Sequence, residues 1–206
     1  MILVDYNQVS LSAILSFKDE LSRPNTDIKN LVRHVVLSNI LQYKKKYSAT
    51  YGELVVCCDG RKYWRKEVFP YYKGDRKKSR ENSDIDWKLV FTVLDEMRSE
   101  VREYLPYKII HIDSAEADDV IAVLCEWTQE NNLVQNGLYQ DPQKNMIISS
   151  DADFLQLQKW DNVHQFSPRA KKQLTMSKRD LWEKYITHIV KAGDDGIPGI
   201  LADDDT

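Results

Sequence analysis

The sequence has few of the features that mark secreted, disulfide-bonded or membrane proteins. Its three cysteines, Cys57, Cys58 and Cys125, are spaced for neither a zinc site nor a disulfide framework. No apolar run approaches the ~18 residues that a membrane span needs, and the N-terminus lacks the basic region and long apolar stretch of a signal peptide. The four histidines are scattered and match no catalytic motif. We therefore expect a protein of the reducing cytoplasm, with no membrane partner.

Positive charge is scarce outside one segment. The chain of 206 residues has 29 Lys and Arg against 32 Asp and Glu, which gives a net charge of −3. Residues 61–80 hold nine basic and two acidic side chains, so this segment carries +7 and the rest of the chain −10. Interleaved with the cations are five aromatic residues, Tyr63, Trp64, Phe69, Tyr71 and Tyr72. Cations neutralise phosphates and aromatic rings stack on bases, so the segment indicates nucleic-acid binding; a solvated loop is the alternative.

Short apolar runs alternate with helical patterns along the chain. The runs are too short for buried helices, and their β-branched residues favour strands. They cover residues 1–4, 54–58, 108–112 and 146–149. Apolar residues at helical spacing lie between them, over residues 28–40, 87–101 and 120–127. This alternation predicts an α/β fold with a mostly parallel central sheet and helices on both faces.

Carboxylates stand just beyond each predicted strand. They are Asp5, Asp59, Asp113 and Asp151. Parallel strands end at one edge of a sheet, where ligands bind in such folds, so we expect these side chains to lie together. A single Asp there is usually a turn former or a helix cap, but four strands that end alike favour a site. Oxygen ligands suit Mg²⁺ or Mn²⁺, and two such ions can drive phosphodiester hydrolysis.

The last segment predicts a helix followed by a tight turn. Residues 177–191 are amphipathic, with Ser177 as the N-cap and an apolar face that includes Leu181 and Trp182. Residues 193–199 contain glycines and a proline, which favour a turn with exposed amides. Such amides can hold a phosphate, although an ordinary loop between helices is the alternative.

Together these motifs resemble the 5′-nuclease (flap endonuclease) superfamily, and within it the branch of T-even-type phage ribonuclease H. The matching segments are Val-Asp-Tyr-Asn (4–7), Cys-Asp-Gly (58–60), Tyr-Trp-Arg-Lys (63–66), Tyr-Tyr-Lys-Gly-Asp-Arg (71–76), Glu-Ala-Asp-Asp (116–119), Ser-Ser-Asp-Ala-Asp-Phe (149–154) and Asp-Gly-Ile-Pro-Gly (195–199). The resemblance implies a PIN-like 5′-nuclease catalytic domain over residues 1–176, in which residues 61–83 form a basic arm over the active site. Residues 177–206 would be the incomplete start of a helix–two-turn–helix region.

The resemblance also implies the roles of individual residues, with two divalent ions, Mg²⁺ or Mn²⁺, as cofactors. Catalytic ligands of the first ion would be Asp5, Asp59, Glu116 and Asp118. Around the second ion would stand Asp119, Asp151, Asp153 and Asp195. The family has an acid three residues before Asp195, where this chain has Ala192, so either Asp194 replaces it or one outer ligand is missing.

The same resemblance implies how nucleic acid is held. Lys73 and Arg76 would be catalytic residues at the scissile phosphate, and Tyr72 would stack on a terminal base. Further nucleic-acid contacts would come from Arg61, Arg65, Lys66, Lys77, Lys78, Gly196 and Gly199. Asp113 has no role in this family.

The implied activity is that of a metal-dependent 5′→3′ nuclease, an exonuclease or flap endonuclease with ribonuclease H activity. Its substrates would be RNA–DNA and DNA duplexes or flaps, and its role RNA primer removal during DNA replication. The resemblance further implies a monomer in the cytoplasm of a phage-infected bacterium, with a single-stranded-DNA-binding protein as a partner. Two alternatives stay open: a non-cleaving branched-DNA-binding protein of the same fold, and a small-molecule phosphatase, which leaves residues 61–80 unexplained.

Overall fold

The computed structural model describes residues 1–23, 26–62, 64–70, 72–73, 85–131, 133–136 and 139–187. The strands are β1 (Ile2–Asp5), β2 (Leu54–Cys58), β3 (Lys108–His111), β4 (Leu133–Asn136), β5 (Tyr139–Pro142), β6 (Asn145–Ile148), β7 (Val163–Ser167) and β8 (Lys172–Leu174). The helices are α1 (Tyr6–Leu15), α2 (Lys18–Leu21), α3 (Ile28–Tyr51), α4 (Trp64–Val68), α6 (Trp87–Tyr104), α7 (Ala117–Glu130), the 3₁₀ helix η1 (Ala152–Lys159) and α8 (Lys178–Thr187).

One sheet organises the fold, with the strand order β3-β2-β1-β6-β7-β8. Its strands pair in parallel from β3 to β7, and β8 runs antiparallel to β7. In register, Asp5 lies opposite Cys57, and Ile148 lies opposite Phe166, so these strands end close to one line. The strands β4 and β5 form a separate antiparallel hairpin. The predicted mostly parallel sheet is therefore confirmed.

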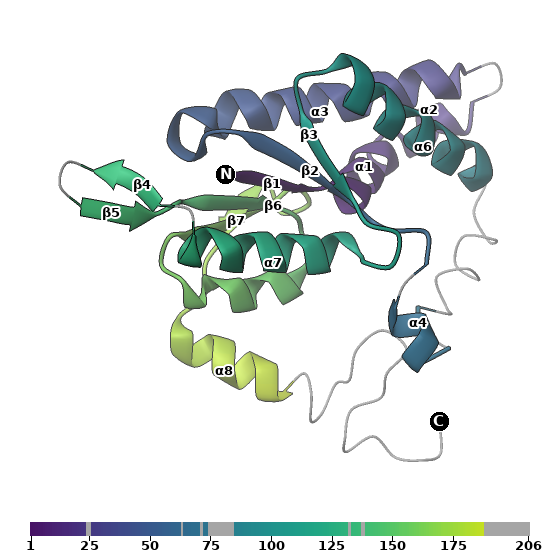
Figure 1. Cartoon of the computed structure of the whole chain (residues 1–206). Helices are drawn as coiled ribbons and strands as arrows, with labels where there is room; N and C mark the ends of the chain where they lie inside the picture. Colours follow the sequence, from purple (N-terminus) through teal and green to yellow (C-terminus); the bar gives the residue numbers. More distant parts are fainter. Residues whose placement is uncertain are drawn as a thin grey trace, which may run out of the picture.

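Helices cover both faces of this sheet, as predicted (Figure 1). The strand β1 is buried throughout, and its residues alternate between the two faces. Ile2 and Val4 join the core beneath α1, α3 and α6, whereas Leu3 joins the core beneath α7 and η1. Burial on both faces explains why β1, β2 and β6 are continuous apolar runs.

The helix starts follow ordinary capping chemistry. Asp27 caps α3 by accepting from the Asn30 backbone N–H at 3.1 Å. Asp86 caps α6 in the same way. None of the described helices is both long enough and apolar enough to cross a membrane.

The C-terminal helix α8 starts where the sequence predicts. The Ser177 hydroxyl accepts the Asp180 backbone N–H at 3.1 Å, which is the expected cap. On the helix, Trp182 is 65% exposed and Ile186 is 40% exposed, so the described fold leaves much of the apolar face uncovered. Residues 188–206 lie outside the described residues, and the domain boundary at residue 176 stays a prediction.

Candidate active site

Four elements bring carboxylates to one edge of the sheet. Asp5 ends β1, Asp59 follows β2, Asp151 follows β6, and Asp118 lies in the first turn of α7. Burial, and then the charges of Asp118 and Asp59, raise the pKa of Asp5 to about 8. Burial, and then the charge of Asp151, raise the pKa of Asp118 to about 7, with Asp59 and Glu116 adding to the effect. Such mutual shifts require proximity, so Asp5, Asp59 and Asp151 lie near one another, together with Asp118. Asp113, which the sequence places at the same edge, is exposed after β3 and is not among the charges that cause these shifts.

Asp59 is held by two donors from other segments. Its Oδ2 accepts from Nδ2 of Asn7 at 2.6 Å, and its Oδ1 accepts from the backbone N–H of Ala117 at 2.8 Å. One carboxylate therefore fastens α1, the end of β2 and the start of α7 to one another. Asn7 stands in a motif that sequence analysis noted, but only the structure shows what its side chain does.

A hydroxyl and an amide connect the ends of β1, β6 and β7. The Ser149 hydroxyl donates to Asp5 Oδ2 at 3.0 Å and accepts the Asp151 N–H at 3.1 Å. The Gln165 side chain, which is fully buried, donates to the carbonyls of Ser149 at 3.0 Å and Asp151 at 2.6 Å. Asp153 is exposed at the start of η1, where its N–H donates to Asp151 Oδ1. Gln165, which sequence analysis missed, thus positions the loop that carries Asp151.

Replacing Gln165 with Leu is expected to lower the rate of the phosphodiester cleavage that the sequence resemblance implies about tenfold, and the free energy of unfolding by ~1–3 kcal/mol. The reason is that the carbonyls of Ser149 and Asp151 lose their donor, so the Asp151 loop is less well fixed. Single-turnover kinetics and urea unfolding measure the two effects. Gln129→Leu, on α7 and away from this loop, is the control. Unchanged rate and stability in Gln165→Leu would remove the positioning role.

Two cations and a phenol surround Glu116. This carboxylate is 1% exposed, and it accepts from Lys73 Nζ at 2.6 Å, from Arg65 Nη1 at 2.9 Å and from the Tyr72 hydroxyl at 3.1 Å. A buried charge needs such partners, because desolvation otherwise costs several kcal/mol. Glu116 is also the N-cap of α7 and forms a capping box with Asp119. It therefore joins the basic arm to the acidic edge.

Asp119 serves as the anchor of α4. Both guanidinium Nη atoms of Arg65 donate to it, at 2.9 and 2.8 Å, and Trp64 Nε1 adds a bond at 3.2 Å. Burial raises the pKa of Asp119, but the hydrogen bonds from Arg65 and the Glu116 N–H outweigh burial, and the pKa is lowered overall. The family resemblance predicts Asp119 as a metal ligand and Arg65 as a nucleic-acid contact; in the structure they bind each other.

The remaining predicted contacts lie on the basic arm or beyond it. Arg61 and Lys66 are exposed, as a nucleic-acid contact requires. Tyr72 is 7% exposed and bonded to Glu116, so stacking on a base would require the ring to leave this position, and that role stays a prediction. Outside the described residues lie Arg76, Lys77, Lys78, Asp194, Asp195, Gly196 and Gly199.

The carboxylates fit a hard divalent cation by their chemistry, because every donor is an oxygen. Among the described residues, however, no three His, Cys, Asp or Glu side chains are arranged to hold a metal ion. The ion pairs of Glu116 and Asp119 are one reason, since protein cations occupy their oxygens. No hydrogen bond or ion pair joins Asp118 to another described residue. Asp118, together with Asp5 and Asp151, therefore has the most acceptor capacity left for a metal.

The fold and the site define an α/β domain with a carboxylate centre at its strand ends and a cationic segment beside it. The family model described as the 5′-3′ exonuclease, N-terminal resolvase-like domain matches residues 1–186. The chain belongs to this family of 5′-nuclease domains.

A curated relative is similar along most of this chain. Ribonuclease H of Enterobacteria phage T4 is 36% identical over 194 residues, which cover 92% of this chain and 59% of the phage protein. The chain thus spans about three fifths of the length of this relative.

Solved structures share the fold. One is bacteriophage T5 5′-exonuclease with bound divalent zinc ions, at a TM-score of 0.67 and 23% identity, covering 98% of this chain and 70% of that chain. Another is the bacteriophage T5 flap endonuclease in a complex with DNA and metal ions, at a TM-score of 0.67 and 22% identity, with the same coverage. These likenesses confirm the predicted PIN-like 5′-nuclease fold.

Proposed function

We propose that this chain is a metal-dependent 5′→3′ nuclease that hydrolyses phosphodiesters in RNA–DNA and DNA duplexes or flaps. The observation that carries the proposal is the convergence of Asp5, Asp59, Asp118 and Asp151 at one sheet edge, beside the basic arm. Burial, and then repulsion by Asp151, raise the pKa of Asp118 to about 7. A divalent cation bound among these carboxylates would offset their repulsion. The family match and the name of the phage T4 relative support the same activity.

The residues at the carboxylate edge would have two kinds of role, metal binding and positioning. Asp5, Asp118 and Asp151 would hold the metal, while Asn7 and Ala117 fix Asp59 beside them. Bound Mg²⁺ or Mn²⁺, two ions in this proposal, supplies the charge that activates water and stabilises the leaving oxygen. The metal ions bound to the structural neighbours support this dependence.

The cations of the arm would act on the nucleic acid itself. Lys73 and Arg65 already neutralise Glu116, so the acidic edge repels an approaching phosphate less. The charge of Lys73 acts on Asp118, where it counters the rise in the pKa of that carboxyl. In this proposal Lys73 would contact the scissile phosphate, as would Arg76.

The test is cleavage of a 5′-labelled RNA–DNA duplex and of a DNA flap, with Mg²⁺ and with a chelator. Products are expected with Mg²⁺ and not with the chelator. Calorimetric titration of Mg²⁺ counts the ions and should give two. Product formation at the same rate with the chelator as with Mg²⁺ would contradict the proposal.

A non-cleaving DNA-binding protein is the second candidate. It is favoured by the ion pairs on Glu116 and by the absence of a three-ligand group among the described residues. Such a protein would bind a flap with and without chelator and give no product in either case. The nuclease proposal has four further parts. The protein would be a monomer, would act in the cytoplasm of a phage-infected bacterium, would remove RNA primers and would have a single-stranded-DNA-binding protein as a partner.

A further inference from the structure

The C-terminal part of α7 belongs to a long acidic stretch of the chain. Residues 109–143 contain seven acidic residues and no Lys or Arg, so their charge is opposite to that of residues 61–80. Four of these acids occur between residues 113 and 119, where β3 leads into α7. The other three, Glu126, Glu130 and Asp141, lie on the rest of α7 and on β5, and the candidate active site does not use them.

Large apolar side chains are exposed among these acids. Val123 is 62% exposed and Trp127 is 47% exposed, one helical turn apart on α7. On the hairpin that follows α7, Val134 of β4 is 49% exposed. Glu126 and Glu130 are also exposed and share the helix face of Val123 and Trp127. We name these five residues the α7–β4 face.

The two glutamates of this face lack the cations that such positions usually have. No hydrogen bond or ion pair joins Glu126 or Glu130 to another described residue. Glu130 is the last residue of α7, and the last turn holds no basic residue. The carbonyl groups at a helix C-terminus carry partial negative charge, so they disfavour acids and favour cations there. A cation from another molecule would therefore be stabilised at this end of α7.

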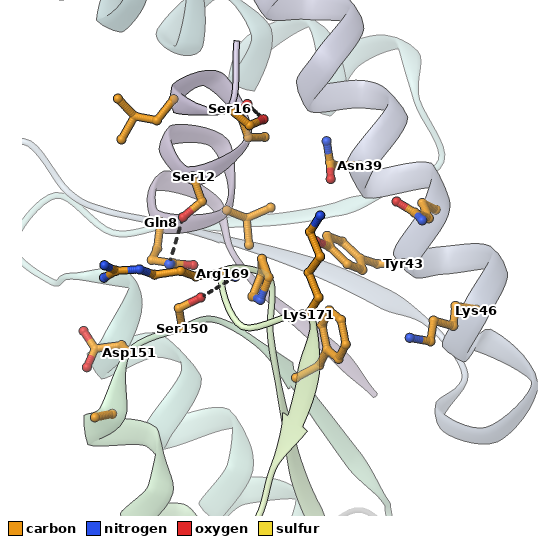
Figure 2. Close-up of a pocket in the computed structure, with 17 residues that line it drawn as sticks. Gln8, Ser12, Ser16, Asn39, Tyr43, Lys46, Ser150, Asp151, Arg169 and Lys171 are labelled. Atoms are coloured by element: carbon orange, nitrogen blue, oxygen red, sulfur yellow. Dashed lines mark hydrogen bonds between the residues drawn. The ribbon is translucent and has the colours of Figure 1, made fainter. Parts of the chain in front are cut away.

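The α7–β4 face lies away from the cations that could hold nucleic acid. Figure 1 shows the β4–β5 hairpin at one end of α7, and α4 of the basic arm beyond the other end. Lys46, Arg169 and Lys171 line a groove of about 1220 Å³ beside Asp151, between α1, α3 and the turn at residues 168–171 that joins β7 to β8 (Figure 2). Phosphates are attracted to such cations and repelled by acids, so the α7–β4 face does not suit a nucleic acid.

We infer that the α7–β4 face binds a basic amphipathic helix of a partner protein. The apolar residues of that helix would cover Val123, Trp127 and Val134, and its Lys or Arg residues would pair with Glu126 and Glu130. Trp is among the residues that most often carry the binding energy of an interface. Because this face is remote from the carboxylate edge, the partner would leave the candidate active site open. The inference does not depend on the proposed nuclease function.

The test measures the binding of a fluorescein-labelled helical peptide to the protein by fluorescence anisotropy. The peptide has about 18 residues, with Leu at every third and fourth position and Lys at most others. The wild type is expected to bind it saturably, and more tightly at low salt than at high salt. A second peptide, with Glu in place of every Lys, is expected to bind at least ~10-fold more weakly.

Variants of the face separate its apolar and charged contributions. Trp127→Ser is expected to raise the Kd of the Lys peptide about tenfold or more, because the ring is the largest apolar group exposed on this face. Glu126→Gln/Glu130→Gln is expected to raise this Kd about threefold to tenfold at low salt and to weaken its salt dependence.

The matched controls are Tyr104→Ser and Glu103→Gln, which change an exposed aromatic residue and an exposed acid on α6. Both are expected to leave the Kd of the Lys peptide unchanged. Thermal melting verifies that every variant is folded, and sedimentation measures the oligomeric state. Cleavage of an RNA–DNA duplex in Mg²⁺ should be equal in Trp127→Ser and the wild type.

Three results would overturn the inference. They are absence of binding to the wild type, equal binding by Trp127→Ser and the wild type, and equal binding of the Lys and Glu peptides. Self-association of the wild type that Trp127→Ser abolishes also overturns it, because the face would then join two copies of this chain. All these results leave the nuclease proposal standing, since cleavage in Mg²⁺ tests that proposal separately.

Discussion

Replacing Asp118 with Asn is expected to lower the rate of phosphodiester cleavage by ~10³-fold or more. Asp118 lies among Asp5, Asp59 and Asp151, and no protein cation is hydrogen-bonded to it in the described structure. Its charge is thus available for a divalent cation, and an amide of the same shape removes that charge alone. Single-turnover cleavage of a 5′-labelled RNA–DNA duplex in Mg²⁺ measures the effect.

Stability separates a catalytic loss from an unfolded protein. Because the folded-state pKa of Asp118 is raised to about 7, ionisation opposes folding, and its destabilising effect grows as pH rises from the unfolded-state pKa to the folded one. Without metal at pH 8, Asp118→Asn should therefore melt at the same or a higher temperature than the wild type. Asp113→Asn, an exposed acid at the end of β3, is the control and should cleave normally. Full activity in Asp118→Asn would refute the metal assignment.

Replacing Gly60 with Ala is expected to reduce cleavage by ~10²-fold and the free energy of unfolding by about 1–3 kcal/mol. A Cβ at this position would lie 2.3 Å from the carbonyl oxygen of Ile112 and 2.5 Å from that of Asp113. The Gly60 N–H also donates to the Ala115 carbonyl at 2.7 Å. Relief of the clash requires backbone movement between Asp59 and the segment that leads into α7, so the carboxylates separate. Cleavage rates and urea unfolding measure the two losses.

Gly52→Ala is the matched control for that experiment. Gly52 caps α3 with φ 80° and ψ −131°, a conformation that only glycine adopts easily, and it has open space around its Cα. Its replacement should also cost about 1–3 kcal/mol, because of backbone strain far from the carboxylates. Equal losses of activity in both variants would show that Gly60 matters for stability alone.

Much of the fold was readable from local signals. The strands β1, β2 and β6 are buried on both faces, so each is a mostly apolar run. Asp5 ends β1, Asp59 directly follows β2, and Asp151 lies three residues after β6. The strand β7 was missed because its sequence, Val163–Ser167, is mostly polar. The strand β7 is mostly buried nonetheless. The Gln165 amide can be buried because its Nε2 donates to the carbonyls of Ser149 and Asp151 in the neighbouring loop.

What the sequence by itself determined is the type of chemistry: carboxylates at parallel strand ends, and a cationic segment after the second of them. These follow from residue type and position along the chain. Only the tertiary structure decided which groups compensate one another, such as Lys73 and Arg65 on Glu116. It also decided that α1, α3 and the β7–β8 turn enclose a groove beside Asp151. Such pairings join residues far apart in the chain, and no local pattern encodes them, because they depend on strand order and on side-chain packing.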